Sequence, residues 1–530
     1  MDNNQQYLVY GPKQEYRIRY EFLGKYVYEC LTTRKPNEII AIDALTKTKL
    51  TCEELLSKSI KLSIALKKLS IEKGDVIVFL SENNLLYYIA LCASLYCGAQ
   101  LIFLNPMYKT DELKHAFSIS KPKLVFASKT VLEIVLSIQK EFDCIQEVVL
   151  MNNDNTLGVQ SINELIENID SVAGFEIRKV DLKDTVFLCL SSGTTGLPKC
   201  VEMTHENLIP FMNYIRDKYY FHLTSKDVAV VVIPFFHIYG LLVHLVPTNL
   251  FTVVVMKSFK PEVYLQSIEE YKATKLFVVP PILQFLVNSP MVSKFNLTSV
   301  EDIFVGGAAL SPDLYNEALV KFKHCSIRQL YGSTETAGAC TVQHADDKFI
   351  TVGKVVMNGI IKIVDPDTKA VLGPYEKGEI RFKSLSVMKG YFNNPTETKN
   401  SIDSDGFYCT GDIGYYDENK NFYIVDRLKE LIKYKGFQVS PVEVENLLLK
   451  HPSVKDCGVI GIPDDRCGQL PSALVVRKPN SDVTEEELIK FVAEKISIHK
   501  QLHGGVRFVQ ELPRTPSGKI IRRELMKLYF

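Results

Sequence analysis

The sequence predicts an α/β fold, with a large N-terminal domain of two α/β lobes plus a β lobe, and a small mobile α+β domain at the C-terminus. Short apolar runs rich in β-branched residues alternate with helical patterns as far as about residue 330, which is typical of parallel sheets covered by helices. After Gly353 short polar strands and turns follow one another, as in an antiparallel sheet. Beyond about residue 430, helix-capping patterns and short strands indicate a separate compact unit.

The composition is that of a globular chain that recognises its ligands locally. The 530 residues are 46% hydrophobic and 23% charged, and they are too many for one core. The 62 basic and 62 acidic residues cancel, so no overall field favours nucleic acid or an anionic membrane. No apolar stretch reaches the roughly 18 residues of a transmembrane segment. The 12 cysteines are scattered without a Cys-x-x-Cys pair, which favours a reducing, cytoplasmic compartment.

The first lobe is expected to extend to about residue 180. Strand, helix and strand follow one another in the pattern of a parallel sheet, and the helical stretches place their leucines near the 3.6-residue period. The expected elements are strand 40–43, helix 51–69, strand 76–80, helix 85–96, strand 101–104 and strands 123–127 and 147–150.

A buried strand is expected at 185–190, and the second lobe is expected beyond residue 199, where continuous apolar runs predict strands buried on both faces. Because ligands of open α/β sheets bind at the carboxyl ends of the strands, the loop after each strand is a candidate site. The expected strands of the second lobe are 228–233, 252–256, 276–279 and 303–305.

The loop at residues 191–199, with the sequence SSGTTGLPK, is the strongest candidate for a phosphate site. Two glycines allow close backbone approach, four hydroxyls and the free N–H groups can surround an anion, and Lys199 supplies a cation. The loop is not a Walker A motif, because Cys200 and Val201 follow the lysine. An ordinary surface loop is the alternative. The candidate ligands are Ser191, Ser192, Gly193, Thr194, Thr195, Gly196 and Lys199.

Later loops carry further candidates that also have plain structural explanations. His237, among aromatic residues, is more often a packed core residue than a catalyst, and Asp412 beside a glycine is a common turn residue. Lysines between residues 427 and 435 can form a solvated face, and Lys519 can be an exposed loop lysine. The remaining motifs are GGAA at 306–309, QLYGSTET at 329–336 and TPSGKI at 515–520.

Taken in order, these motifs resemble those of the adenylate-forming superfamily, which includes acyl-CoA synthetases, 4-coumarate:CoA ligases, beetle luciferases and peptide-synthetase adenylation domains. The similarity covers about residues 185–520. It implies an AMP-binding domain at residues 1–426, a hinge at 427–429 and a mobile C-terminal domain at 430–530.

The resemblance also implies the nucleotide contacts. Tyr331 stacks on the adenine, Thr334 holds the α-phosphate, Asp412 and Arg427 bind the ribose, and Glu335 reaches Mg²⁺, with Thr194 as a second metal contact. A flat ring suits a base, and a hard cation takes oxygen ligands. Besides the residues of the phosphate loop, the implied nucleotide and CoA set comprises Gln329, Tyr331, Gly332, Thr334, Asp412, Arg427, Lys429, Lys433, Gly436 and Gln438.

Three catalytic residues follow from the same resemblance. Lys519 bridges the reacting carboxylate and the α-phosphate, Lys435 serves thioester formation with its neighbours, and His237 faces the acyl substrate. A point cation is suited to the charge that develops on a phosphoryl group. The expected acyl pocket is lined by Phe235, His237, Tyr239, Gly306, Gly307, Ala308 and Gly338.

The predicted activity is an acyl-CoA synthetase that uses ATP, Mg²⁺ and coenzyme A on a small carboxylic acid, either a fatty or an arylpropenoic acid. A beetle luciferase-type monooxygenase is the first alternative. Phe211 and Gly338 stand where luciferases carry an arginine and a serine, which argues against light emission. A non-catalytic nucleotide-binding protein is the second alternative. The family makes a peroxisome conceivable, but the final residues 527–530 are not Ser-Lys-Leu. The sequence predicts no oligomeric state.

Overall fold

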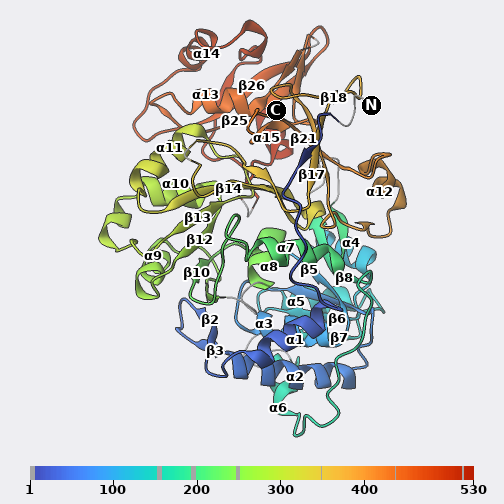
Figure 1. Ribbon diagram of the computed structural model, residues 1–530. Coiled ribbons are helices and arrows are strands. Elements are labelled where there is room, and N and C mark those ends of the chain that lie inside the picture. The colour runs from blue at the N-terminus through green and yellow to red at the C-terminus, as the bar shows by residue number, and fades with distance from the viewer. Residues whose placement is uncertain are drawn as a thin grey trace.

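The computed structural model describes residues 6–151, 158–191, 198–245, 251–347, 349–435, 437–515 and 518–530. It is a mixed α/β protein in which a large N-terminal domain lies below a smaller C-terminal domain (Figure 1), and this confirms the predicted fold class. Among the helices of the described residues, none combines the length and the apolar character needed to cross a membrane.

The first sheet lies at the lower right of Figure 1 and is mainly parallel. The five residues of its strand Val76–Leu80 are all buried, because helices cover both faces of the sheet. In hydrogen-bonded order the strands are β20 (Gly390–Tyr391), β9 (Lys199–Thr204), β8 (Thr185–Ser191), β5 (Gln100–Phe103), β4 (Val76–Leu80), β6 (Leu124–Ala127) and β7 (Glu147–Leu150).

The second sheet is also largely parallel and carries the loops expected to bind ligands. In order its strands are β16 (Lys354–Val355), β15 (Gly338–Val342), β14 (Ser326–Ser333), β13 (Asp302–Val305), β12 (Lys275–Val278), β10 (Val228–Val231), β11 (Thr252–Val255), β2 (Ile39–Asp43) and β3 (Lys49–Thr51).

The predicted lobe boundary near residue 180 is wrong in two places. Strand β2 pairs in parallel with β11 of the second sheet, with Ala41 opposite Val253. Strand β8 pairs with β5 of the first sheet, with Leu101 opposite Phe187. Apolar content identifies a buried strand but does not specify its partner, so the exchange of strands between the lobes could not be foreseen.

The third sheet is antiparallel, as predicted for the segment after Gly353, and includes a strand from the N-terminus. Figure 1 shows it between the two α/β lobes and the C-terminal domain. Its order is β1 (Val9–Tyr10), β17 (Ile360–Val364), β19 (Gly378–Lys383), β21 (Tyr408–Tyr416) and β22 (Phe422–Arg427), and β18 (Val371–Leu372) pairs with β17.

The C-terminal domain is built on a fourth sheet. Ser440 caps the helix that follows the first hairpin by accepting the N–H of Glu443, whereas the Glu443 carboxylate pairs with Lys500. The elements are β24 (Phe437–Val439), β23 (Ile432–Tyr434), β26 (Gly468–Arg477), β25 (Val454–Asp464) and β27 (Val506–Phe508), with α13 (Pro441–Leu448), α14 (Glu485–Ala493) and α15 (Arg522–Tyr529).

Helices of the large domain cover the first two sheets. The helix predicted at 51–69 is present and begins with a capping box in which Thr51 and Glu54 exchange hydrogen bonds. The helices are α1 (Leu23–Thr33), α2 (Cys52–Lys68), α3 (Leu86–Tyr96), α4 (Thr110–Ser120), α5 (Leu132–Gln139), α6 (Ile162–Glu167), α7 (Ile209–Tyr214), α8 (Ile238–Leu245), α9 (Pro261–Glu270), α10 (Pro280–Asn288), α11 (Pro312–Lys321) and α12 (Pro395–Ser401).

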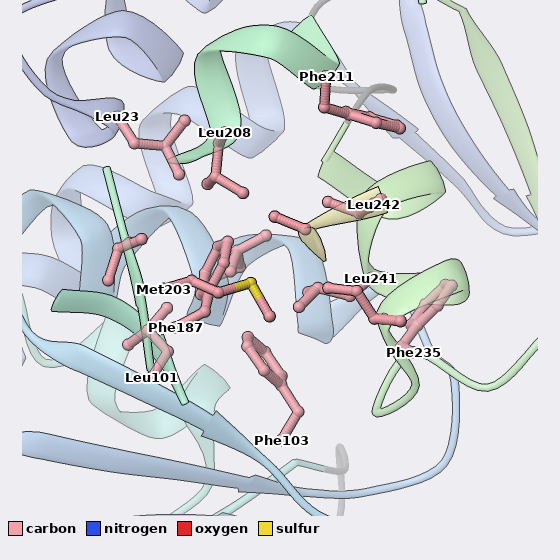
Figure 2. Close-up of a cluster of buried hydrophobic side chains, with 14 of the residues drawn as sticks. Leu23, Leu101, Phe103, Phe187, Met203, Leu208, Phe211, Phe235, Leu241 and Leu242 are labelled. Carbon is pink, nitrogen blue, oxygen red and sulfur yellow. The ribbon is translucent and has the colours of Figure 1, made fainter. Parts of the chain in front are cut away.

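One continuous apolar core joins the two lobes. Figure 2 shows Phe103 and Phe187 of the first sheet facing Leu241 of α8, with Phe211 and Leu242 further along the same cluster. All five side chains are at most 5% exposed. The core therefore extends from the structural lobe to α7 and α8, which border the cleft described below.

Buried His205 is expected to make the protein less stable in mild acid. It is 3% exposed, its Nδ1 accepts the N–H of Leu23 at 3.2 Å, and burial lowers its pKa to about 4. Between pH 6.5 and 4 the unfolded chain therefore binds a proton that the folded chain does not, so stability falls as the pH falls.

We expect His205→Gln to flatten this acid dependence by roughly 1.4 kcal/mol per pH unit, measured from denaturant midpoints at pH 7 and pH 5. His324→Gln, at an exposed position, is the control. If wild type and the His205 variant lost the same stability between pH 7 and pH 5, the acid dependence would not come from His205.

Candidate active site

A cavity of about 2550 Å³ separates the large domain from the C-terminal domain. It is bordered by the carboxyl ends of β8, β13 and β14 and by strands β21 and β22, and residues of the C-terminal domain close its other side. This is the edge at which open α/β sheets bind their ligands. Of the predicted site residues it brings together Ser191, Lys199, His237, Tyr239, Gly306, Gly307, Ala308, Gln329, Tyr331, Gly332, Thr334, Glu335, Gly338, Asp412, Arg427, Lys429 and Lys519.

Tyr331, Asp412 and Arg427 form one polar group inside the cleft. The Tyr331 hydroxyl donates to Asp412 Oδ2 at 2.8 Å, and Arg427 Nε lies 3.4 Å from Asp412 Oδ1. Asp412 and Arg427 are opposite each other in the β21–β22 pair, which explains how residues fifteen positions apart meet. Burial raises the pKa of Asp412 and the Arg427 cation opposes this effect. The carboxylate offers acceptors to a ligand with neighbouring hydroxyls, such as a ribose.

Glu335 lies in a short turn after β14 and is 6% exposed. Its Oε1 accepts hydrogen bonds from Ser191 Oγ at 2.8 Å and from the Tyr391 hydroxyl at 3.2 Å. Within the described residues no cluster of three acidic, histidine or cysteine side chains is placed to hold a metal ion. A single carboxylate fits a magnesium ion that takes its other oxygens from phosphate and water.

Lys519 enters the cleft from the C-terminal domain. A side chain on the preceding Gly518 would come within 3.0 Å of Pro281 in α10, so the loop touches the large domain. Burial and the Arg427 cation lower the pKa of Lys519, while Asp412 and Glu335 oppose them. Lys519 therefore borders the same cavity as Asp412 and Glu335, and their charges act on its ammonium group.

His237 is a neutral imidazole in this environment. Burial, with a smaller contribution from the Lys519 cation, lowers its pKa to about 4. Nδ1 accepts the N–H of Tyr239 at 3.3 Å, which leaves the proton on Nε2 as a donor for a ligand.

The residues expected to serve thioester formation lie elsewhere. Lys433, Lys435 and Gln438 are exposed on the β23–β24 hairpin and do not border the cavity. Lys435 has a left-handed backbone with φ of 49° and donates its N–H to Cys467 O at 2.8 Å. In this arrangement of the domains Lys519 therefore borders the cleft, and Lys435 lies outside it.

Phe235 does not line the predicted acyl pocket. It is fully buried and packs edge to face on Tyr87, with ring centroids 5.3 Å apart. Phe236 borders the cavity in its place. Phe235 and Phe236 are the central residues of a turn closed by a hydrogen bond from the His237 N–H to Pro234 O at 3.1 Å. Phe235 faces the core seen in Figure 2, and its neighbour faces the cleft.

Aromatic and small residues form the acyl end of the cavity. Phe221 and Phe277 border it, and both stack on Phe304, with centroids 4.8 and 5.2 Å away. Gly338 has φ of 126°, and a Cβ there would lie 2.5 Å from the Tyr214 hydroxyl and 3.2 Å from Phe211 Cδ2. A serine at this position, as in luciferases, would therefore not fit without rearrangement of both rings.

Some predicted residues lie outside the described parts of the chain, namely Ser192, Gly193, Thr194, Thr195, Gly196 and Gly436. Conversely, the structure adds Glu397 and Tyr391, which sequence reasoning missed. Glu397 forms an ion pair with Lys199, and the Tyr391 ring lies 5.1 Å from the Lys199 ammonium. No sequence signal marks Glu397, because its helix α12 has no buried residue and resembles any polar surface helix.

Asp426 links the end of the large domain to the start of the C-terminal domain. Its carboxylate accepts the Ser440 hydroxyl at 2.5 Å and the N–H of Val442 at 3.1 Å. Asp426 and Ser440 are both at most 5% exposed. The carboxylate thus holds the N-terminus of α13, where a negative charge is favourable.

The fold and the contents of this cleft define an adenylate-forming enzyme. The family profile described as "AMP-binding enzyme" matches residues 31–392, and that described as "AMP-binding enzyme C-terminal domain" matches residues 443–519. The chain belongs to this family.

Its relatives include both luciferases and ligases. Luciferin 4-monooxygenase of Nipponoluciola cruciata is 38% identical, with 99% of this chain and 98% of the relative covered. Probable 4-coumarate–CoA ligase 2 of Dictyostelium discoideum is 36% identical, with 93% and 92% covered. ATP-bound MatB from Rhodopseudomonas palustris superposes with a TM-score of 0.87 at 25% identity, with 96% and 99% covered.

Proposed function

We propose that the protein is an ATP-dependent acyl-CoA synthetase, which converts a carboxylic acid, ATP and CoA into acyl-CoA, AMP and pyrophosphate. The observation that carries the proposal is the placement of two lysines. Lys519 borders the cleft together with Asp412 and Glu335, whereas Lys435 is exposed on another part of the same domain. This is what a two-step reaction requires if each step uses a different face of one mobile domain.

The first step forms an acyl-adenylate. An oxygen of the substrate carboxylate attacks the α-phosphorus of ATP, and the bond to the departing pyrophosphate breaks. In this proposal Lys519 stabilises the charge that develops between carboxylate and phosphate, Asp412 and Arg427 hold the ribose, and His237 Nε2 donates to the carboxylate. Magnesium held at Glu335, when bound, would neutralise phosphate charge.

The second step forms the thioester. The C-terminal domain is proposed to rotate about residues 427–429, which withdraws Lys519 and brings the β23–β24 hairpin with Lys435 to the cleft. The CoA thiol then loses its proton to solvent, its sulfur attacks the acyl carbon, and the bond from that carbon to the phosphate oxygen of AMP breaks. The Asp426 contact with Ser440 spans this hinge, so it holds the arrangement in which Lys519 is inserted.

The proposed substrate is an acid with an apolar distal end, either a fatty acid or an arylpropenoic acid. The described residues at that end of the cavity supply rings and aliphatic groups, including Phe211, Phe277 and Leu242. The Tyr239 hydroxyl at this end already donates to Phe304 O at 3.0 Å. The Tyr214 hydroxyl, which accepts the N–H of Ala339 at 3.1 Å, is fully buried behind the described lining of the cavity.

We therefore expect cinnamate to be used more efficiently than 4-coumarate, and decanoate more efficiently than decanedioate. A buried hydroxyl without a partner costs about 1–2 kcal/mol, which corresponds to about a five- to thirtyfold difference in kcat/KM. The test is AMP release with ATP, magnesium and CoA across this panel. A preference for the hydroxylated or the dicarboxylic acid would contradict the proposed pocket.

A luciferase-type monooxygenase is the second candidate, and the 38% identity to a luciferin 4-monooxygenase favours it. The lack of space for a side chain at Gly338 and the apolar side chain of Phe211 argue against a luciferase. Adding luciferin to the same panel and recording light together with AMP release separates the two candidates.

A further inference from the structure

The ion pair between Lys199 and Glu397 lies at the part of the cleft where the phosphates of ATP are proposed to bind. Lys199 opens β9 directly after the phosphate loop, Glu397 lies on α12, and both border the cavity. The Lys199 ammonium donates to Glu397 Oε2 and also faces the Tyr391 ring at 5.1 Å. The cation assigned to phosphate therefore already has an anionic partner supplied by the protein.

Glu397 is held in place for this contact. Its own N–H donates to the Asn394 side chain at 3.1 Å, which caps α12, and the next residue, Thr398, accepts the N–H of Tyr391 at 2.8 Å. A glutamate at the third position of a helix often turns back to cap the helix. Here its carboxylate instead reaches Lys199, a residue 198 positions away in the chain.

The charges around the pair indicate what it does. Lys199, followed by a smaller effect of Lys429, holds the pKa of Glu397 below its usual range, so the carboxylate is charged at neutral pH. A phosphate group that approaches Lys199 meets this negative charge beside the ammonium. Binding of the anion must therefore displace or repel the carboxylate, and departure of the anion restores the pair.

We propose that Glu397 is a positioning residue that acts through Lys199, because it competes with phosphate groups for the ammonium and thereby favours release of pyrophosphate. The inference rests on the proposed function, because it concerns the same nucleotide site. It differs from that proposal in placing an anion beside the cation of the predicted phosphate loop, whose own residues supply only donors and that cation.

The test compares wild type with Glu397→Gln by calorimetric titration of inorganic pyrophosphate and of ATP, both with magnesium. We expect the variant to bind both about three- to tenfold more tightly, because the partly buried competitor has lost its charge. Adenosine, which carries no phosphate, is expected to bind equally to both proteins. Glu486→Gln removes the same charge from an exposed position on α14 and is expected to change nothing.

In turnover, Glu397→Gln is expected to lower the inhibition constant of pyrophosphate by the same factor, with an unchanged KM for the acid. Equal or weaker pyrophosphate binding by the variant would overturn the inference alone. Failure of wild-type protein to bind ATP would overturn the proposed function as well, so the two failures are distinguishable.

Discussion

Replacing Lys519 with alanine is expected to reduce acyl-adenylate formation by about 10²- to 10³-fold, the usual effect of removing one stabilising group from a charged transition state. Lys519 belongs to the C-terminal domain and borders the cleft together with Asp412 and Glu335. The measurement is the rate of ATP–pyrophosphate exchange in the presence of the preferred acid.

Two comparisons make the Lys519 experiment specific. Lys527→Ala, on the exposed side of α15 where the lysine pairs with Glu524, is expected to keep the wild-type rate. A preformed acyl-adenylate supplied with CoA is expected to react normally with the Lys519 variant, because the proposed second step does not use that lysine. Exchange within fivefold of wild type would exclude the proposed role.

Replacing Lys435 with alanine is expected to have the opposite pattern. Conversion of preformed acyl-adenylate and CoA to thioester should fall by about 10- to 100-fold, the range for a misplaced reactant. ATP–pyrophosphate exchange should not change, since Lys435 is exposed and outside the cleft when Lys519 is inside it. Stopped-flow or quenched assays of the two half-reactions give both rates.

Lys450→Ala is the matched control for Lys435, because it removes an exposed lysine from the same domain at the end of α13. Loss of exchange in the Lys435 variant would show that the lysine acts in the first step. Unchanged thioester formation in the Lys435 variant would show that Lys435 on the β23–β24 hairpin does not act on the reacting groups. The proposed rotation of the C-terminal domain would then lose its support.

The positions of strands and of most motif residues could be predicted from the sequence. Strands such as β8 and β12 contain continuous apolar runs, and the residues that follow them fall at the edge of a sheet for geometric reasons. Asp412 and Arg427 meet because their strands pair, and each stands in a recognisable motif.

Other features depend on contacts that no local pattern contains. The partner of β2 is set by packing between lobes rather than by the apolar content of the strand. Phe235 and Phe236 are chemically identical, and only the direction of the backbone decides which one faces the cleft. Glu397 meets Lys199 through the position of a polar helix, and Asp426 meets Ser440 through the placement of a whole domain.

The exchange of strands between the two lobes imposes a delay on folding during synthesis. Strand β2 (Ile39–Asp43) is made early, yet the strand it pairs with, β11 (Thr252–Val255), emerges more than two hundred residues later. At about 5–20 residues per second the ribosome needs roughly 10–40 s to supply that partner. During this interval the apolar stretch Ile39-Ile40-Ala41-Ile42 has one edge unpaired, which is the condition under which strands associate with other chains. The nascent protein therefore depends on shielding of this segment before its second lobe exists.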